Sequence, residues 1–212
     1  MVAIIDYGVG NLFSLMSSLN YVGIENKLTD DENIIKKSAA IILPGVGAFR
    51  DAIEKLEKKN EGILKETLIE ESKKGKIILG ICLGMQMFFD KSYEYGEYEG
   101  LGLIKGEICP IEKDLKNKEL KVPHMGWNNL NIKKEDKIFK YIKNKEFVYF
   151  VHSYYAKNCS KSIIADSEYD IEIPAVVKKN NIYGIQFHPE KGGNTGLNIL
   201  KGFKDLICRR DL

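Results

Sequence analysis

The sequence predicts an α/β fold with a largely parallel central sheet, helices on both of its faces and an antiparallel extension. Two observations lead to this prediction. In the first half of the chain, continuously apolar runs alternate with segments of helical periodicity, which is typical of parallel strands covered by helices. After about Gly106 the apolar runs become shorter and follow one another closely, which favours antiparallel strands. No low-complexity linker separates the two halves, so we expect a single domain over residues 1–212.

The first half alternates strands with helices along the chain. Its apolar runs predict strands at residues 2–6, 39–43 and 77–81. Helices are expected at residues 11–22, at about 48–59 and at 61–74. In the first of these helices the apolar side chains fall on one face: Leu12, Leu15, Met16 and Leu19. A helix of this kind buries one stripe against a sheet, as the predicted layers require.

The second half contributes short strands and a closing helix. The expected strands are residues 128–132, 146–152, 162–166, 175–179 and 182–186. Residues 196–207 are expected to close the chain as a helix. Because nothing separates the two halves, we expect these strands to extend the sheet of the first half.

The composition is that of a globular protein of enzyme size. Of the 212 residues, 44% are hydrophobic and 29% charged, and 32 Lys and Arg against 30 Asp and Glu leave a net charge of +2. This balance gives no reason to expect nucleic acid or a membrane as a partner. We also expect no targeting segment, since Met1 runs directly into an apolar strand. The four cysteines are far apart and form no Cys-x-x-Cys pair, so we expect no metal, no cofactor and a cytoplasmic location.

The most informative segment is residues 77–89, where an apolar strand, the turn Gly80-Ile81-Cys82-Leu83-Gly84 and a helical pattern follow one another. This is the nucleophile-elbow arrangement with a thiol in place of a hydroxyl. Glycines on both sides let the chain turn tightly and let backbone approach the sulfur. The helix expected behind Cys82 would direct its free N–H groups and positive dipole end at the sulfur, which favours the thiolate. A buried cysteine is more often inert, but this setting favours a reactive one.

Chemistry in such a sheet collects at the carboxyl ends of the strands. The loops expected there are Asp6-Tyr7-Gly8-Val9-Gly10-Asn11, Pro44-Gly45-Val46-Gly47, the Cys82 turn and His188-Pro189-Glu190. The first lacks the third glycine of a dinucleotide-binding loop, and the second lacks the Gly-Lys-Ser/Thr ending of a phosphate-binding loop. Two interpretations of the second loop stay open: it presents backbone N–H groups to an oxyanion, or it is only a tight turn.

The three histidines of the chain narrow the choice of a catalytic base. A reactive thiol needs a base to take its proton and an acid to protonate the leaving nitrogen, and one imidazole can do both. That imidazole needs a carboxylate partner to hold its tautomer and stabilise its charged form. Only His188 has one close by, Glu190, across the stiff Pro189. For His152 we favour a hydrogen-bonded structural role.

Six motifs together resemble a known family. The motifs Pro44-Gly45-Val46-Gly47, Gly80-Ile81-Cys82-Leu83-Gly84-Met85-Gln86 and His188-Pro189-Glu190 resemble the class I, triad-type glutamine amidotransferases. Within that class, the segments Asp6-Tyr7-Gly8-Val9-Gly10-Asn11, Pro123-His124-Met125-Gly126-Trp127-Asn128 and Tyr149-Phe150-Val151-His152-Ser153-Tyr154 resemble the glutaminase subunits of imidazole glycerol phosphate synthase. The resemblance covers nearly the whole chain and implies a flavodoxin-like arrangement of the sheet.

The resemblance also implies a mechanism. Cys82 attacks the side-chain amide of glutamine, and His188, oriented by Glu190, protonates the departing ammonia and then activates water. The tetrahedral oxyanion is held by the backbone N–H groups of Leu83 and Val46. The residues implied in glutamine binding are Gly45, Gln86, Glu94, Ser153 and Tyr154. The neighbouring tyrosines at positions 93, 95 and 98 make the surroundings of Glu94 atypical for the family.

The family docks its glutaminase on a (βα)₈-barrel cyclase. The cyclase uses the ammonia to form imidazole glycerol phosphate, with aminoimidazole carboxamide ribonucleotide as by-product, in histidine biosynthesis. The resemblance therefore implies a heterodimer. The implied interface residues are His124, Met125, Trp127, Tyr149 and Lys191. Trp127 could be an ordinary core residue, but its turn-rich segment is compatible with an interface anchor.

Other functions stay open at this stage. Residues 192–195 depart from the serines that the family more often has there, close to the implied interface. A paralogous glutaminase that feeds a cyclase-like partner amidating a surface sugar would have the same triad. A stand-alone cysteine hydrolase of the same fold would need no partner. A non-catalytic regulatory subunit is disfavoured, because Cys82, His188 and Glu190 are all present.

Overall fold

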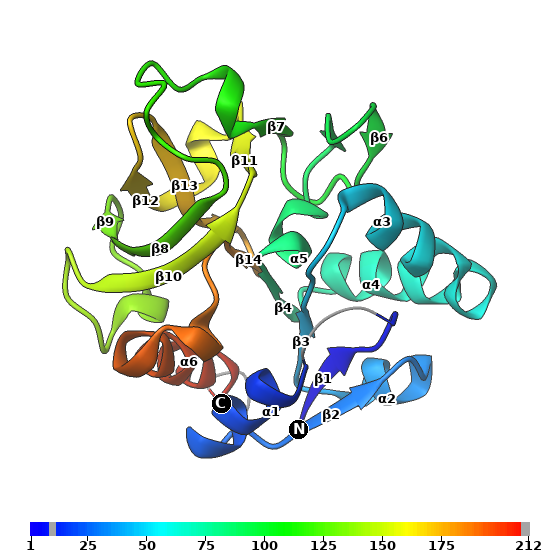
Figure 1. Ribbon diagram of the computed structural model, residues 1–212. Helices are drawn as coiled ribbons and strands as arrows, with labels where there is room; N and C mark the ends of the chain where they lie inside the picture. Colours follow the sequence, from blue (N-terminus) through cyan, green and yellow to red (C-terminus); the bar gives the residue numbers. More distant parts are fainter. Residues whose placement is uncertain (9–11, 209–212) are drawn as a thin grey trace.

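The computed structural model describes residues 1–8 and 12–208, and its centre is an eight-stranded sheet (Figure 1). In spatial order the strands are β2 (Asn26–Thr29), β1 (Val2–Ile5), β3 (Ala40–Leu43), β4 (Ile77–Ile81), β14 (Ile182–Ile185), β13 (Glu172–Lys179), β12 (Ile163–Glu168) and β9 (Asn131–Ile132). The pairs from β2 to β14 are parallel, and those from β14 to β9 are antiparallel. This confirms the predicted parallel sheet with an antiparallel extension, and the order of its parallel part is flavodoxin-like.

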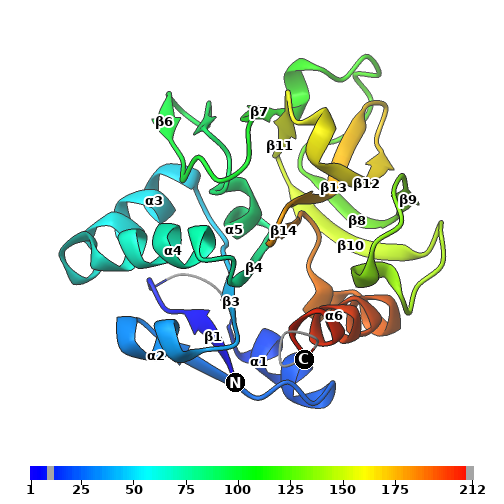
Figure 2. The same cartoon turned by 180° about the vertical axis from the view of Figure 1, so that it is seen from behind.

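Helices cover both faces of the sheet, as Figures 1 and 2 show from opposite sides. They are α1 (Leu12–Tyr21), α2 (Glu32–Lys37), α3 (Phe49–Lys58), α4 (Ile63–Lys73) and α6 (Gly193–Cys208). Short 3₁₀ turns occur at η1 (Lys59–Gly62), η2 (Ile111–Lys113), η3 (Lys137–Phe139), η4 (Ser160–Ser162) and η5 (Pro189–Lys191). Among the described residues, no helix has the length and apolar character needed to cross a membrane.

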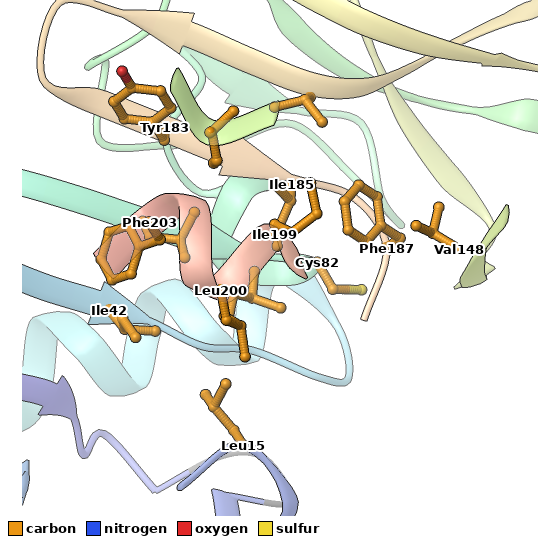
Figure 3. Packing of buried hydrophobic residues seen from close by; sticks show 14 of the residues in the cluster. Leu15, Ile42, Cys82, Val148, Tyr183, Ile185, Phe187, Ile199, Leu200 and Phe203 are labelled. Carbon is orange, nitrogen blue, oxygen red and sulfur yellow. The ribbon is translucent and has the colours of Figure 1, made fainter. Parts of the chain in front are cut away.

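The strands contribute side chains to two hydrophobic layers, because successive side chains of a strand point to opposite faces of the sheet. In β1, Val2 and Ile4 join the layer beneath α1 and α6, whereas Ala3 and Ile5 join the layer beneath α2, α3 and α4. Figure 3 shows the first layer, in which side chains of α1 and α6 pack on the sheet. Strands that are buried on both faces read as continuous apolar runs, which is why the first half was predictable.

The elements of the first half that were missed include the edge strand β2 and the six-residue helix α2. The strand has the sequence Asn-Lys-Leu-Thr, and only its last residue is buried. An edge strand has one paired side and one solvated side, so it needs no apolar run. The helix is capped by the preceding residue, Asp31, whose side chain accepts a hydrogen bond from the Asn33 N–H group at 2.8 Å.

The expectation that the second half simply extends the central sheet is only partly correct. Strands β8 (His124–Asn129) and β10 (Phe147–His152) form a separate antiparallel pair. A further small sheet contains β11 (Tyr154–Lys157), β7 (Glu107–Pro110), β5 (Lys91–Ser92) and β6 (Tyr98–Glu99). Burial alternates along β10, so one face of this pair packs on the core and the other is left open.

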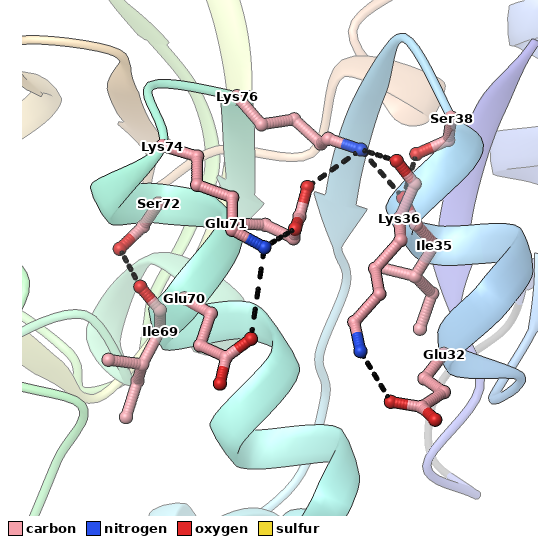
Figure 4. A network of polar contacts seen from close by, with 10 residues as sticks. All are labelled: Glu32, Ile35, Lys36, Ser38, Ile69, Glu70, Glu71, Ser72, Lys74 and Lys76. Carbon is pink, nitrogen blue, oxygen red and sulfur yellow. Dashed lines mark hydrogen bonds and ion pairs between the residues drawn. The ribbon is translucent and has the colours of Figure 1, made fainter.

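An ionic network around the buried Glu71 lies at the end of the sheet opposite Cys82 (Figure 4). Glu71 is 4% exposed and lies within 2.8 Å of Lys74 Nζ and 2.9 Å of Lys76 Nζ. Burial alone would raise the pKa of Glu71, but the hydrogen bonds from the two lysines outweigh it and lower the pKa. Lys76 also donates to the carbonyl oxygens of Ile35 and Lys36, so one ammonium group joins α4 to the end of α2.

Candidate active site

The candidate site lies where β3, β4 and β14 end. These strands are neighbours and parallel, so their carboxyl ends meet at one edge of the sheet. The chain leaves β4 at Cys82, leaves β3 into residues 44–47 and leaves β14 into residues 186–190. A pocket of about 600 Å³ opens at this edge, and its lining includes Cys82, Val46 and His188. The structure therefore brings together segments that are more than a hundred residues apart in the sequence.

Cys82 has an unfavourable backbone conformation at the turn, with φ 52° and ψ −110°. A non-glycine residue in this region costs roughly 1–3 kcal/mol and needs support from its surroundings. That support comes from close packing of the flanking glycines. A Cβ on Gly84 would lie 1.8 Å from the Leu43 carbonyl oxygen, and one on Gly80 would lie 2.4 Å from the Phe88 ring. The glycines were expected to let the chain turn and to let backbone approach the sulfur; in the structure their lack of side chains lets β3, β4 and the following turn approach one another.

The helix behind the cysteine is shorter than the sequence pattern indicated. Helix α5 spans only Leu83–Gln86, a single turn. A macrodipole grows with the number of aligned peptides, so the dipole expected to favour a thiolate is small here.

His188 and Glu190 form a buried pair facing Cys82. The Nδ1 atom of His188 lies 2.8 Å from Glu190 Oε1, and their side chains are 3% and 9% exposed. Burial alone would lower the pKa of His188, but hydrogen bonds with Cys82 and Glu190, and their charges, raise it to about 9. Because Nδ1 is bonded to Glu190, the Nε2 atom is the one available to the sulfur. The raised pKa favours the imidazolium form of His188 at neutral pH.

The loop at Pro44-Gly45-Val46-Gly47 packs directly against the elbow. A Cβ on Gly45 would lie 2.8 Å from the Tyr7 hydroxyl and 2.9 Å from the Gly84 nitrogen. The buried Tyr7 hydroxyl donates to the Pro44 carbonyl at 2.6 Å, which fixes the start of the loop. Burial and the nearby Cys82 both raise the pKa of Tyr7, so it stays a hydroxyl donor. The sequence pattern placed Tyr7 only within a glycine-containing loop, of which residues 9–11 lie outside the described residues.

Gly45 lines a smaller neighbouring pocket, whereas the other four residues predicted to bind glutamine meet in the site pocket. Its lining includes Gln86, Glu94, Ser153 and Tyr154, together with both predicted oxyanion residues, Leu83 and Val46. Val46 is 44% exposed, in contrast to the buried Leu83. The structure thus places these residues around one cavity beside the sulfur, while their individual roles stay predictions.

Two of these residues also have structural tasks. The Gln86 side chain donates from Nε2 to the Tyr154 carbonyl and to Gln186 Oε1, each at 3.0 Å. Glu94 Oε2 accepts from the Phe49 N–H group at 2.6 Å and so caps the start of α3. Burial raises the pKa of Glu94, while the bond from Phe49 opposes that rise. The atypical surroundings noted for Glu94 therefore do not displace it from the pocket.

Most residues predicted at the interface lie on the open face of the β8–β10 pair. Met125 and Trp127 are 62% and 55% exposed. The rings of Trp127 and Tyr149 meet edge to face at 6.0 Å, and Lys191 Nζ lies 5.8 Å from the Tyr149 ring centre. A Cβ on Gly193 would lie 3.7 Å from the Trp127 ring, so the segment that departs from the family pattern borders this face. We call Met125, Trp127, Tyr149 and Lys191 the aromatic face.

His124 differs from the other residues predicted at the interface. Its side chain is only 3% exposed and is stacked between the rings of Phe150 and Tyr169. Its Nδ1 atom lies 3.1 Å from His152 Nε2, and His152 Nδ1 lies 2.9 Å from the Tyr154 carbonyl oxygen. Burial lowers the pKa of His124 to about 4 and, with the help of His124, that of His152 to about 3. His124 therefore belongs to the interior, alongside a hydrogen-bonded His152.

The fold and the site define a class of protein: an α/β domain with a cysteine elbow facing a His–Glu pair. The family model for class I glutamine amidotransferases matches residues 3–205. Among solved structures, a crystal structure of a glutamine amidotransferase shares the fold with a TM-score of 0.74 and 17% identity, covering 98% of this chain and 100% of that one. A structure of PurLQS from Thermotoga maritima has a TM-score of 0.72 and 19% identity, covering 97% of this chain and 98% of that one.

Closer relatives specify the family. The imidazole glycerol phosphate synthase subunit HisH of Caldanaerobacter subterraneus subsp. tengcongensis is 51% identical over 98% of both chains. The protein of the same name from Listeria monocytogenes serovar 1/2a is 47% identical over 97% of this chain and 96% of its own length. The chain belongs to the HisH family of class I glutamine amidotransferases.

Proposed function

We propose that this protein hydrolyses glutamine to glutamate and ammonia as the glutaminase subunit of an imidazole glycerol phosphate synthase. The observation that carries the proposal is the placement of the Cys82 elbow beside the buried His188–Glu190 pair, at a pocket of about 600 Å³. The relatives at 51% and 47% identity are named as subunits of that synthase.

The chemistry follows from the protonation state that the geometry favours. The Cys82 thiolate attacks the carboxamide carbon of glutamine, and the developing oxyanion lies next to the N–H groups of Leu83 and Val46. The His188 imidazolium gives its Nε2 proton to the nitrogen, so that ammonia leaves and a thioester remains. Neutral His188 then takes a proton from water, and the resulting hydroxide attacks the thioester. Glutamate leaves, and the thiolate–imidazolium pair is restored.

The same proposal assigns the aromatic face to a (βα)₈-barrel cyclase. Exposed Met125 and Trp127 form an apolar patch of the kind that serves as an interface anchor. Lys191 borders both the patch and the active-site pocket, since it lines the pocket and its Nζ atom lies over the Tyr149 ring. A cyclase seated on the patch would cover the pocket and receive ammonia before it reaches bulk water.

The first test measures glutamate release by the isolated protein and by its complex with the cyclase of the same genome, loaded with nucleotide ligand. Stimulation of about a hundredfold or more, on the scale of one oxyanion donor coming into place, supports the proposal. High activity without a partner points to an independent hydrolase. Silence in both conditions points to a different, sugar-amidating partner.

A second test isolates the role of Cys82. The complex that carries Cys82→Ala should lose glutamine-dependent synthesis and still make product from added ammonium salts, because only ammonia production depends on the thiol. Glutamine hydrolysis retained by this variant would overturn the mechanism.

A further inference from the structure

Gln186 is a buried side chain next to Cys82 that the mechanism above does not use. It follows β14 directly, is 0% exposed and lies between two site residues. Its Oε1 atom accepts from Gln86 Nε2 at 3.0 Å, and its Nε2 atom donates to Cys82 Sγ at 3.6 Å. His188 lies two positions further along, after the bend at residues 186–187. Both of them reach the sulfur.

The orientation of this amide is fixed by a group that can only accept hydrogen bonds. The Tyr154 carbonyl oxygen lies 3.0 Å from the Gln86 amide, so Gln86 must present its NH₂ group there. The same NH₂ group also donates to Gln186, which must therefore accept through its side-chain carbonyl oxygen. The NH₂ group of Gln186 is then left to face the sulfur. A backbone carbonyl in the pocket wall thus determines, through two side chains, that Cys82 receives a donor.

We propose that Gln186 is a positioning residue for Cys82, which holds the sulfur and stabilises its thiolate through an N–H···S hydrogen bond. The inference rests on the proposed function, in which the thiolate is the nucleophile. A donor interacts more strongly with an anion than with the neutral thiol, so it favours deprotonation. The helix behind Cys82 has a single turn, and this side-chain donor offsets part of the missing dipole.

The alternative is a glutamine that merely satisfies other buried polar groups. The two roles differ in their effect on the titration of the thiol, because only a donor to the sulfur changes the balance between thiol and thiolate. Labelling of Cys82 by iodoacetamide, which reacts with the thiolate, reports that balance directly. Mass spectrometry of the Cys82 peptide separates it from the exposed Cys208.

The experiment compares Gln186→Met and Gln186→Glu with the native full chain over a range of pH. Methionine is similar in size and lacks a donor, so it reports the loss of the N–H group alone. Glutamate keeps an oxygen for Gln86, removes the N–H group from the sulfur and adds a charge, and both changes act to raise the midpoint. We expect the pH of half-maximal labelling to rise by about one unit in each variant, which is about tenfold slower labelling at pH values below the native midpoint. An unchanged midpoint in a folded Gln186→Glu protein would overturn the proposal, whatever the stability of Gln186→Met.

A matched control comes from the other end of the same strand. Asn181 precedes β14 and uses its amide to bind the carbonyl oxygens of Ser72 and Lys76, far from the pocket. Asn181→Leu also removes a partly buried amide and should leave the labelling midpoint unchanged. A midpoint that moves equally in Asn181→Leu would show a general loosening and also count against the proposal. If Cys82 were not the nucleophile, Cys82→Ala would retain glutaminase activity, which separates failure of the proposed function from failure of this one.

Discussion

Replacing Glu190 with glutamine should move the alkaline limit of glutaminase activity to lower pH. Glu190 Oε1 lies 2.8 Å from His188 Nδ1. Glutamine has the same length, and its amide oxygen can still accept from the Nδ1–H group. The substitution therefore removes a charge and leaves the shape of the pair largely intact.

The magnitude follows from the balance of effects on His188. Burial alone would take its pKa below 6.5, yet hydrogen bonds with Cys82 and Glu190, and their charges, bring it to about 9. A rise of that size corresponds to ~3 kcal/mol in favour of the charged imidazole. Because two partners share this effect, we expect the loss of the Glu190 charge to lower the His188 pKa by about one unit.

The direction in which the alkaline limit moves depends on which protonation state of His188 the reaction needs. The imidazolium gives its proton to the leaving nitrogen, which departs as ammonia, and this acid form persists up to the pKa of His188. A lower pKa removes the acid form earlier as the pH rises, so kcat/KM near pH 9 should fall by up to about tenfold while the value near pH 7 changes less.

The assay is glutamate release by the partner-bound enzyme between pH 6 and 10. The surface variant Glu172→Gln, which loses an exposed pairing with Lys133, is the control and should keep the native profile. An alkaline limit that stays in place in Glu190→Gln would refute the assignment of Glu190 as the charge that holds His188 protonated.

Two further substitutions test the support of the elbow and its loop. Gly84→Ala should lower the free energy of unfolding by about 3 kcal/mol or more, because the new Cβ would lie 1.8 Å from the backbone oxygen of Leu43. Urea unfolding measures this loss, with Gly192→Ala as the control, since a Cβ there would have its nearest contact at 3.1 Å. A loss no larger than that of Gly192→Ala would contradict the prediction. Tyr7→Phe removes the 2.6 Å hydrogen bond to Pro44 and leaves a buried carbonyl unpaired, at a cost of ~1–3 kcal/mol. Its kcat should fall more than its KM rises, and an unchanged kcat in steady-state kinetics would show that this bond does not hold the loop.

Sequence patterns predicted the structure well where a run of one residue type is typical of one kind of element. Apolar runs located the strands that are buried on both faces, and β4 was predicted at its observed limits, Ile77–Ile81. The motifs around Cys82, His188 and Glu190 were correctly placed at the ends of neighbouring strands. Elements with mixed burial were harder, since the polar edge strand β2 needs no apolar pattern.

The sequence by itself determined the parallel α/β core, the position of the thiol at a strand end and the pairing of His188 with a carboxylate two residues away. These properties depend on short segments or on periodic patterns, which can be recognised in the sequence itself. Tertiary structure decided everything that depends on segments distant in the sequence. It decided that Tyr7 holds Pro44, that Gln186 faces the sulfur and that His124 turns inward while Trp127 stays exposed. Such contacts depend on how strands are ordered and which face each side chain takes, and no spacing within one segment encodes them.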